Sequence, residues 1–138
     1  MRRRRTLREM VEARIAERRD DVFLPREFRD LGGEDQVLRV LRGLTREGRL
    51  LRLGYGVYGR AETSNLTGQP MLAAPGGFLG AARQALDKLG VPWEPTEFQR
   101  AYNEGRSTQV PVNPAVRLGK SRFVRRLRYQ DAELRLER

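Results

Sequence analysis

Arginine side chains are the groups in this sequence whose type and spacing can do chemistry, and that chemistry is anion recognition. Among 28 basic residues only Lys88 and Lys120 are lysine, and all the others are arginine. The planar guanidinium group makes bidentate hydrogen bonds to phosphate and to the edge of guanine, which lysine cannot do. A net charge of +10 indicates a polyanionic or acidic partner. Codon bias in a GC-rich genome is an alternative explanation for the excess of arginine over lysine.

The candidate contact residues lie on a predicted helix, on the predicted hairpin that follows it, and in a basic arm at the start of the chain. Their amide and guanidinium groups can hydrogen-bond base edges or phosphates, and a tyrosine at the hairpin turn can stack on sugar. A flexible basic arm can enter a minor groove. The candidate DNA-binding residues are Gln36, Arg39, Arg42, Arg46, Arg49, Arg52, Tyr55, Arg60, Arg2, Arg3, Arg4 and Arg5.

Each of these features also has a simpler interpretation. The helix face can be an ordinary solvated surface, Tyr55 an exposed hairpin residue, and the arm a solubilising tail. Glu34 and Asp35 stabilise the start of the helix through its dipole. They also repel phosphate near that end, unless one of them accepts a hydrogen bond from a cytosine amino group. The helix is nevertheless interpreted as a DNA-contacting element, because it lies between a glycine turn and a hairpin in a basic half.

The composition argues against catalysis and against bound cofactors. The sequence has no histidine and no cysteine, which excludes Cys/His metal sites, thiol nucleophiles, histidine bases and disulfides. The carboxylates are scattered among arginines, and the serines have no histidine partner. We therefore expect a protein that is not an enzyme and needs no cofactor. No apolar run is long enough to span a bilayer, and no apolar segment follows the first arginines. A cytoplasmic protein is expected.

The elements that position the arginines follow a winged helix-turn-helix pattern. Apolar residues recur at helical spacing, a glycine pair makes a turn, and a glycine-tipped hairpin follows the last helix. Thr6 and Glu9 predict a capping box at the start of the first helix. The predicted elements are helices over Leu7–Arg19, from Pro25 to about Leu31, and over Glu34–Glu47, followed by strands over Arg49–Leu53 and Val57–Arg60.

The second half is predicted to be a small mixed α/β domain with an antiparallel sheet. Residues 61–70 are polar and are interpreted as a linker or a strap between this domain, residues 71–138, and the winged helix in residues 1–60. The overall fold class is therefore α+β. The predicted elements are a helix from Gly76 or Gly77 to Leu89, a short helix capped by Thr96 that runs to about Asn103, and strands over Thr108–Val112, Ala115–Leu118, Phe123–Tyr129 and Glu133–Leu136.

A second basic cluster lies on the predicted strands near the end of the chain. It consists of Arg122, Arg125, Arg126 and Arg128. Strand alternation places Arg126 and Arg128 on one face and Arg125 on the other. The cluster is interpreted as a solvated sheet face, with a second nucleic-acid surface and a docking site for an acidic protein as alternatives.

Two sets of motifs in this sequence resemble those of a known family. The first set is Val22-Phe23-Leu24-Pro25, Phe28, Leu31-Gly32, Val37, Leu41, Leu44, Gly48, Leu50, Arg52-Leu53 and Gly56-Val57-Tyr58. The second set is Ser107-Thr108-Gln109-Val110-Pro111, Gly119-Lys120-Ser121-Arg122 and Glu133-Leu134-Arg135. Together they resemble the AbiEi-like antitoxins of type IV toxin–antitoxin systems, over most of residues 22–137. At the hairpin turn Tyr55 stands where a basic residue is more usual.

The resemblance implies a transcriptional repressor of its own operon, whose winged helix binds operator DNA. It also implies that the second domain acts as an antitoxin against a nucleotidyltransferase-like toxin, without a need for direct contact. Two alternatives stay open. One is a winged-helix interaction module that docks an acidic protein partner. The other is an RNA-binding factor, against which the later strands offer only Phe123 and Tyr129 for base stacking.

Overall fold

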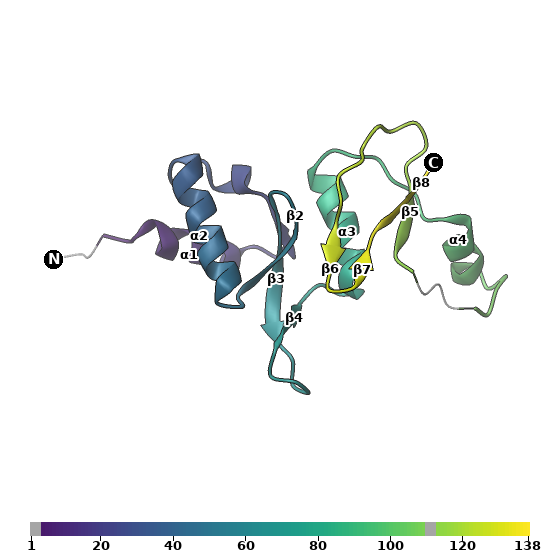
Figure 1. The fold of residues 1–138 in the computed structure, drawn as a ribbon, viewed down its shortest axis with the longest axis horizontal. Coiled ribbons are helices and arrows are strands. Elements are labelled where there is room, and N and C mark those ends of the chain that lie inside the picture. Colours follow the sequence, from purple (N-terminus) through teal and green to yellow (C-terminus); the bar gives the residue numbers. More distant parts are fainter. Residues whose placement is uncertain (1–3, 110–112) are drawn as a thin grey trace.

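The computed structural model describes residues 4–109 and 113–138, which form an α+β fold (Figure 1). Its first helix, α1 (Leu7–Glu17), begins where the Thr6 hydroxyl accepts a hydrogen bond from the Glu9 backbone N–H at 3.1 Å. This confirms the predicted helix cap. The helix ends two residues earlier than predicted. No helix in the described part of the chain is long and apolar enough to cross a bilayer.

A short 3-10 helix and one longer α-helix follow α1. The 3-10 helix, η1 (Pro25–Phe28), replaces the α-helix predicted from Pro25. Pro25 supplies the first turn, but Gly32 and Gly33 follow too soon for a longer helix to form. Helix α2 (Glu34–Arg46) then matches its predicted start closely, and the chain leaves it at Gly48, whose φ of 76° favours glycine.

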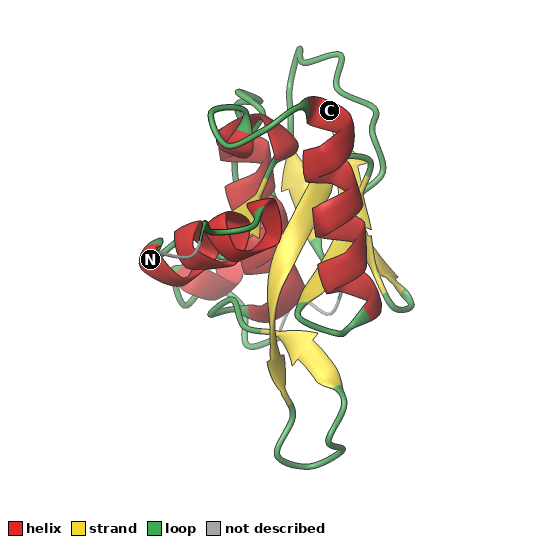
Figure 2. Cartoon of the chain, turned by 90° about the vertical axis from the view of Figure 1, so that its left-hand side faces the viewer, coloured by secondary structure: helices red, strands yellow, loops and turns green. Residues whose placement is uncertain are grey.

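An antiparallel sheet lies against these helices. Strand β3 (Val57–Thr63) is its centre and pairs with β1 (Val22–Phe23) and β2 (Leu50–Gly54) in the order β1-β3-β2. Its far end pairs with β4 (Pro70–Leu72), with Ala61 opposite Leu72. The segment interpreted as a linker or a strap therefore begins within β3 and ends at the first residue of β4. These residues form a β-hairpin that projects from the body of the molecule (Figure 2).

The second half contains helices and two small ladders. Helix α3 (Gly77–Lys88) and helix α4 (Glu97–Asn103) lie where they were predicted, and the Thr96 hydroxyl caps α4. The short strands are β5 (Ala115–Arg117), β6 (Arg128–Tyr129), β7 (Ala132–Glu133) and β8 (Arg135–Glu137). Strands β6 and β7 pair antiparallel, as predicted for this half, whereas β5 and β8 pair in parallel, contrary to that prediction.

Two predicted strands in this half also differ from the structure. Most of the predicted strand over Phe123–Tyr129 is irregular, and only its last two residues form β6. Strand alternation fails there because Val124, Arg125 and Arg126 are all exposed, while only Leu127 is fully buried. Of the strand predicted at residues 108–112, residues 108 and 109 are not extended in a ladder, and residues 110–112 lie outside the described residues.

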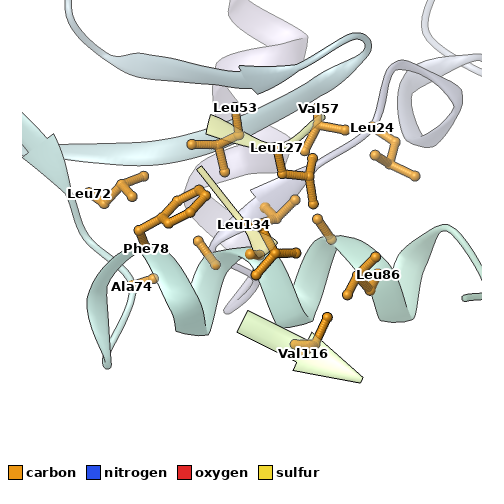
Figure 3. Close-up of a cluster of buried hydrophobic side chains, with 14 of the residues drawn as sticks. Leu24, Leu53, Val57, Leu72, Ala74, Phe78, Leu86, Val116, Leu127 and Leu134 are labelled. Atoms are coloured by element: carbon orange, nitrogen blue, oxygen red, sulfur yellow. The ribbon is translucent and has the colours of Figure 1, made fainter. Parts of the chain in front are cut away.

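Two apolar clusters hold the fold together. The first lies between α1, η1, α2 and the sheet and includes Phe28, Leu41 and Leu50. The second cluster joins the β2–β3 hairpin to the second half of the chain (Figure 3). Its members include Leu24, Leu53 and Val57 before residue 61, and Leu86, Val116, Leu127 and Leu134 after residue 70. One core therefore spans the two predicted domains.

Candidate nucleic-acid interface

Helix α2 presents a row of arginines on the face opposite its buried side. Val37, Leu41 and Leu44 form the buried side of the helix. Residues three and four positions apart lie on the same side of a helix, so the arginines at this spacing on the opposite side face solvent together. Arg39, Arg42 and Arg46 are exposed and line one shallow depression along the helix, together with Asp35 and Leu38. The structure therefore brings three of the predicted contact residues together.

A second depression lies between α2 and the β2–β3 hairpin. Arg42 and Leu38 belong to it as well, so the two depressions are continuous along the helix. Arg52 and Tyr55 line it from the hairpin side. We call this continuous surface, formed by Arg39, Arg42, Arg46, Arg52 and Tyr55, the α2–hairpin groove.

In the part of the chain that the structure describes, the arginines of the α2–hairpin groove have no acidic partners. Within the described ranges none of Arg39, Arg42, Arg46 and Arg52 forms a salt bridge, although many other arginines of the chain do. The Arg52 side chain makes one long hydrogen bond, at 3.4 Å, to the backbone carbonyl of Gly54. Four exposed guanidinium groups are thus available to an anion.

Negative charge is confined to one end of this groove. Glu34 lines the part next to the hairpin, and Asp35 lines the part along the helix. Both carboxylates belong to the first turn of α2, where they stabilise the helix dipole. A polyanion is therefore favoured over the middle and the last turns of α2, and disfavoured at its first turn.

The α2–hairpin groove does not include three of the predicted contact residues, namely Gln36, Arg49 and Arg60. Gln36 is exposed, but the 100° step of the helix turns it to the flank opposite the hairpin. Arg49 forms an ion pair with Glu12 at 3.0 Å and lines a different depression, beside α1. The Glu12 carboxyl also accepts a hydrogen bond from Arg8, and these two arginines hold its pKa below the ordinary value.

Arg60 has a structural role in the fold. Its Nη2 group donates hydrogen bonds to the carbonyl oxygens of Ile15, Arg18 and Asp20, each at 2.8 Å. The guanidinium carbon lies 5.2 Å from the centre of the Phe23 ring. Arg60 therefore ties the end of α1 to the sheet, and its Nε and Nη2 groups are already used in these contacts.

The basic arm is described only in part. Arg4 and Arg5 are exposed ahead of α1. The predicted contact residues Arg2 and Arg3 lie outside the described residues. The arm remains a prediction.

Sequence reasoning did not place Arg125 beside the hairpin turn. Its Nη2 group donates a hydrogen bond to the backbone carbonyl of Tyr55, and its guanidinium carbon lies 5.9 Å from the centre of the Tyr55 ring. Because residues 123–126 form no regular strand, the spacing of residues along this segment gave no signal for the contact.

The described residues contain no cluster of three or more acidic, histidine or cysteine side chains that could hold a metal ion. Comparisons of the chain with protein-family models, with curated proteins and with solved structures found no match.

Proposed function

We propose that this protein binds double-stranded DNA in a sequence-specific manner and represses transcription. The observation that carries the proposal is the set of exposed arginines without acidic partners in the α2–hairpin groove. An arrangement of α1, β1, α2 and the β2–β3 hairpin supports it, because this order is compatible with a winged helix-turn-helix.

The dimensions of α2 fit this role. A helix of this kind is about 10–12 Å wide, and the major groove of B-DNA is about 12 Å wide. With α2 in the groove, Arg39 and Arg42 reach base edges from the middle of the helix, and Arg46 and Arg52 reach the flanking phosphates. The acidic first turn at Glu34 and Asp35 keeps that end of the helix away from the phosphate backbone.

An autorepressing, antitoxin-like role is the more specific form of the proposal. It rests on the resemblance of the motifs to AbiEi-like antitoxins, and the cognate toxin is its implied partner. The same arginines also suit an acidic protein partner, since carboxylates are bound by guanidinium groups as phosphates are.

Replacement of Arg39 tests whether α2 reads bases. We expect Arg39→Ala to weaken binding to duplex DNA from immediately upstream of the gene by about 1–3 kcal/mol, with a smaller loss on a scrambled duplex. The reason is that a base contact contributes only on the matching sequence. Fluorescence anisotropy titrations measure both affinities.

The matched control is Arg135→Ala, which removes the same charge from β8. Arg135 is exposed, and its side chain forms no salt bridge within residues 4–109 and 113–138. If Arg39→Ala binds both duplexes as Arg135→Ala does, the α2 face is not the interface. An equal loss on the two duplexes assigns Arg39 to a phosphate instead.

A further inference from the structure

We propose that Arg125, from the second half of the chain, is part of the same DNA interface and binds a phosphate at the tip of the hairpin. This inference rests on the proposed DNA-binding function. The hairpin turn Gly54–Gly56 contains no basic residue of its own. Arg125 places a positive charge directly on this turn through its contacts with Tyr55.

The Arg125 side chain has donors left for a phosphate. A guanidinium group carries five N–H donors, and the contact with the Tyr55 carbonyl involves only the Nη2 group. Arg125 is exposed and forms no salt bridge in the described part of the chain. Its neighbour Arg126, in contrast, pairs with Glu133 at 3.0 Å. Arg125 is therefore available to an anion.

The backbone next to Arg125 is fixed against the hairpin. A Cβ atom placed on Gly54 would lie only 2.6 Å from the Arg126 carbonyl oxygen, so the two backbones are in close contact. Leu127 is almost fully buried in the core that also contains Leu53 and Val57. The side chain of Arg125 thus starts from a well-anchored position, which limits the entropy lost when it binds.

Arg125 continues the line of positive charge in the α2–hairpin groove. Tyr55 lines this groove together with Arg42 and Arg52, and Arg125 lies over the Tyr55 ring. DNA that follows the groove from α2 across the hairpin therefore reaches Arg125 at its end. The second half of the chain contributes to the interface through this contact, in addition to its part in the core.

The test is the salt dependence of binding for Arg125→Ala, with Arg135→Ala as the control for net charge. We expect Arg125→Ala to weaken binding about tenfold on the upstream duplex and on a scrambled duplex alike. The slope of log K against log salt should fall in magnitude by about 1, because one phosphate contact is lost. Thermal melts by circular dichroism confirm that each variant is folded.

A second variant separates phosphate binding from positioning of the turn. Arg125→Gln keeps an N–H donor for the Tyr55 carbonyl but removes the charge. We expect Arg125→Gln to show the same reduced slope of log K against log salt as Arg125→Ala. Recovery of the wild-type affinity and slope in Arg125→Gln would overturn the inference, as would an Arg125→Ala variant that behaves like Arg135→Ala.

The same titrations separate this inference from the proposed function. A wild-type protein that binds both duplexes equally contradicts sequence-specific function, while the slope of Arg125→Ala still decides the phosphate contact. A wild-type protein that binds neither duplex overturns both.

Discussion

The arginines that the structure describes fall into two groups. In the first group the guanidinium binds other groups of the fold, and in the second it is exposed to solvent without an acidic partner. Arg60 represents the first group, because its guanidinium is enclosed by three backbone carbonyls and the Phe23 ring. Arg39 and Arg42 represent the second, being exposed and free of acidic partners within the described ranges. Only the second group can bind a new anion without first breaking contacts of the fold.

Replacement of Arg60 should affect stability rather than DNA contact. We expect Arg60→Ala to lower the free energy of unfolding by about 2 kcal/mol, because several carbonyls lose a charged donor. Arg60→Lys should recover only part of this loss, since one ammonium cannot match the guanidinium geometry. Urea denaturation followed by circular dichroism measures the effect.

Arg52→Ala is the matched control on the neighbouring strand. Its side chain is exposed and makes only one long hydrogen bond, so its loss should change stability by less than about 0.5 kcal/mol. Equal stability of Arg60→Ala and Arg52→Ala would contradict the structural role of Arg60.

The positions of the candidate contact residues on α2 were predictable from the sequence, but which arginines have free donors was not. Arg39, Arg42 and Arg46 follow from the helical spacing of the buried residues. Arg60 lies on the same hairpin as Arg52, and Arg49 directly precedes it. Nothing in the local sequence shows that groups of α1 already bind the side chains of Arg60 and Arg49. Their partners come from segments more than thirty residues away in the chain.

At the scale of elements, the β2–β3 hairpin is held in place by a close contact with the second half of the chain. Gly54 leaves room for the backbone of Arg126, and Leu127 packs beside it. The position of the hairpin relative to α2 decides the width of the α2–hairpin groove. The segment before β6 therefore supports the interface even though it forms no regular strand.

A methyl group on Gly54 tests this contact. We expect Gly54→Ala to lower the free energy of unfolding by about 1–3 kcal/mol, because its Cβ would clash with a backbone carbonyl that cannot easily move. The urea midpoint reports the change. We also expect weaker DNA binding, since the hairpin must shift away from residue 126.

Gly43→Ala is the control for the glycine-to-alanine change itself. Gly43 lies within α2, and the nearest atom to its added Cβ is the mobile Arg46 Nη2 at 3.8 Å. It should raise stability by about 0.5–1 kcal/mol through helix propensity. A Gly54→Ala variant as stable as the wild-type protein would show that the hairpin contact is dispensable.

Helices were predicted better than strands, for a physical reason. The periodicity behind α2 and α3 is local, whereas a strand exists only where a partner pairs with it. Residues 61–63 became part of β3 because β4 pairs with them. Residues 123–126 lack such a ladder, and of these four only Phe123 packs against the core.

At the scale of the whole molecule, the two halves are joined by charge as well as by the shared core. The Lys88 ammonium at the end of α3 contacts Asp20 at 2.8 Å and Glu27 at 2.7 Å. The Gln84 side-chain oxygen accepts hydrogen bonds from the backbone N–H groups of Asp21 and Val22. The winged-helix-like half is therefore held by α3.

The junction predicts how stability changes with pH. The hydrogen bond from Lys88 holds the pKa of Asp20 below its ordinary value. Asp20 therefore contributes stability above about pH 4, the range of an unfolded aspartate, and loses it as the pH falls through the lower folded pKa. Asp20→Asn should lower the free energy of unfolding at pH 7 by less than about 1 kcal/mol, because the pair is partly exposed.

Urea denaturation between pH 7 and pH 3 measures this contribution. The decline in stability on acidification should be smaller in Asp20→Asn than in the wild-type protein. It should persist in part, because the pKa values of Glu12, Asp30 and Glu47 are lowered too. Asp131→Asn, at an exposed turn, is the control. Identical pH profiles for the two variants would contradict the role of the junction.

The most direct test of the central claim is a comparison of two duplexes with the wild-type protein. One duplex comes from immediately upstream of the gene and the other has the same bases scrambled, and both are titrated at near-physiological salt and over a range of salt. Our account predicts a preference for the upstream duplex of about a thousandfold or more. Equal affinities with a steep salt slope would contradict it, because they would mean that the arginines bind phosphate without reading sequence.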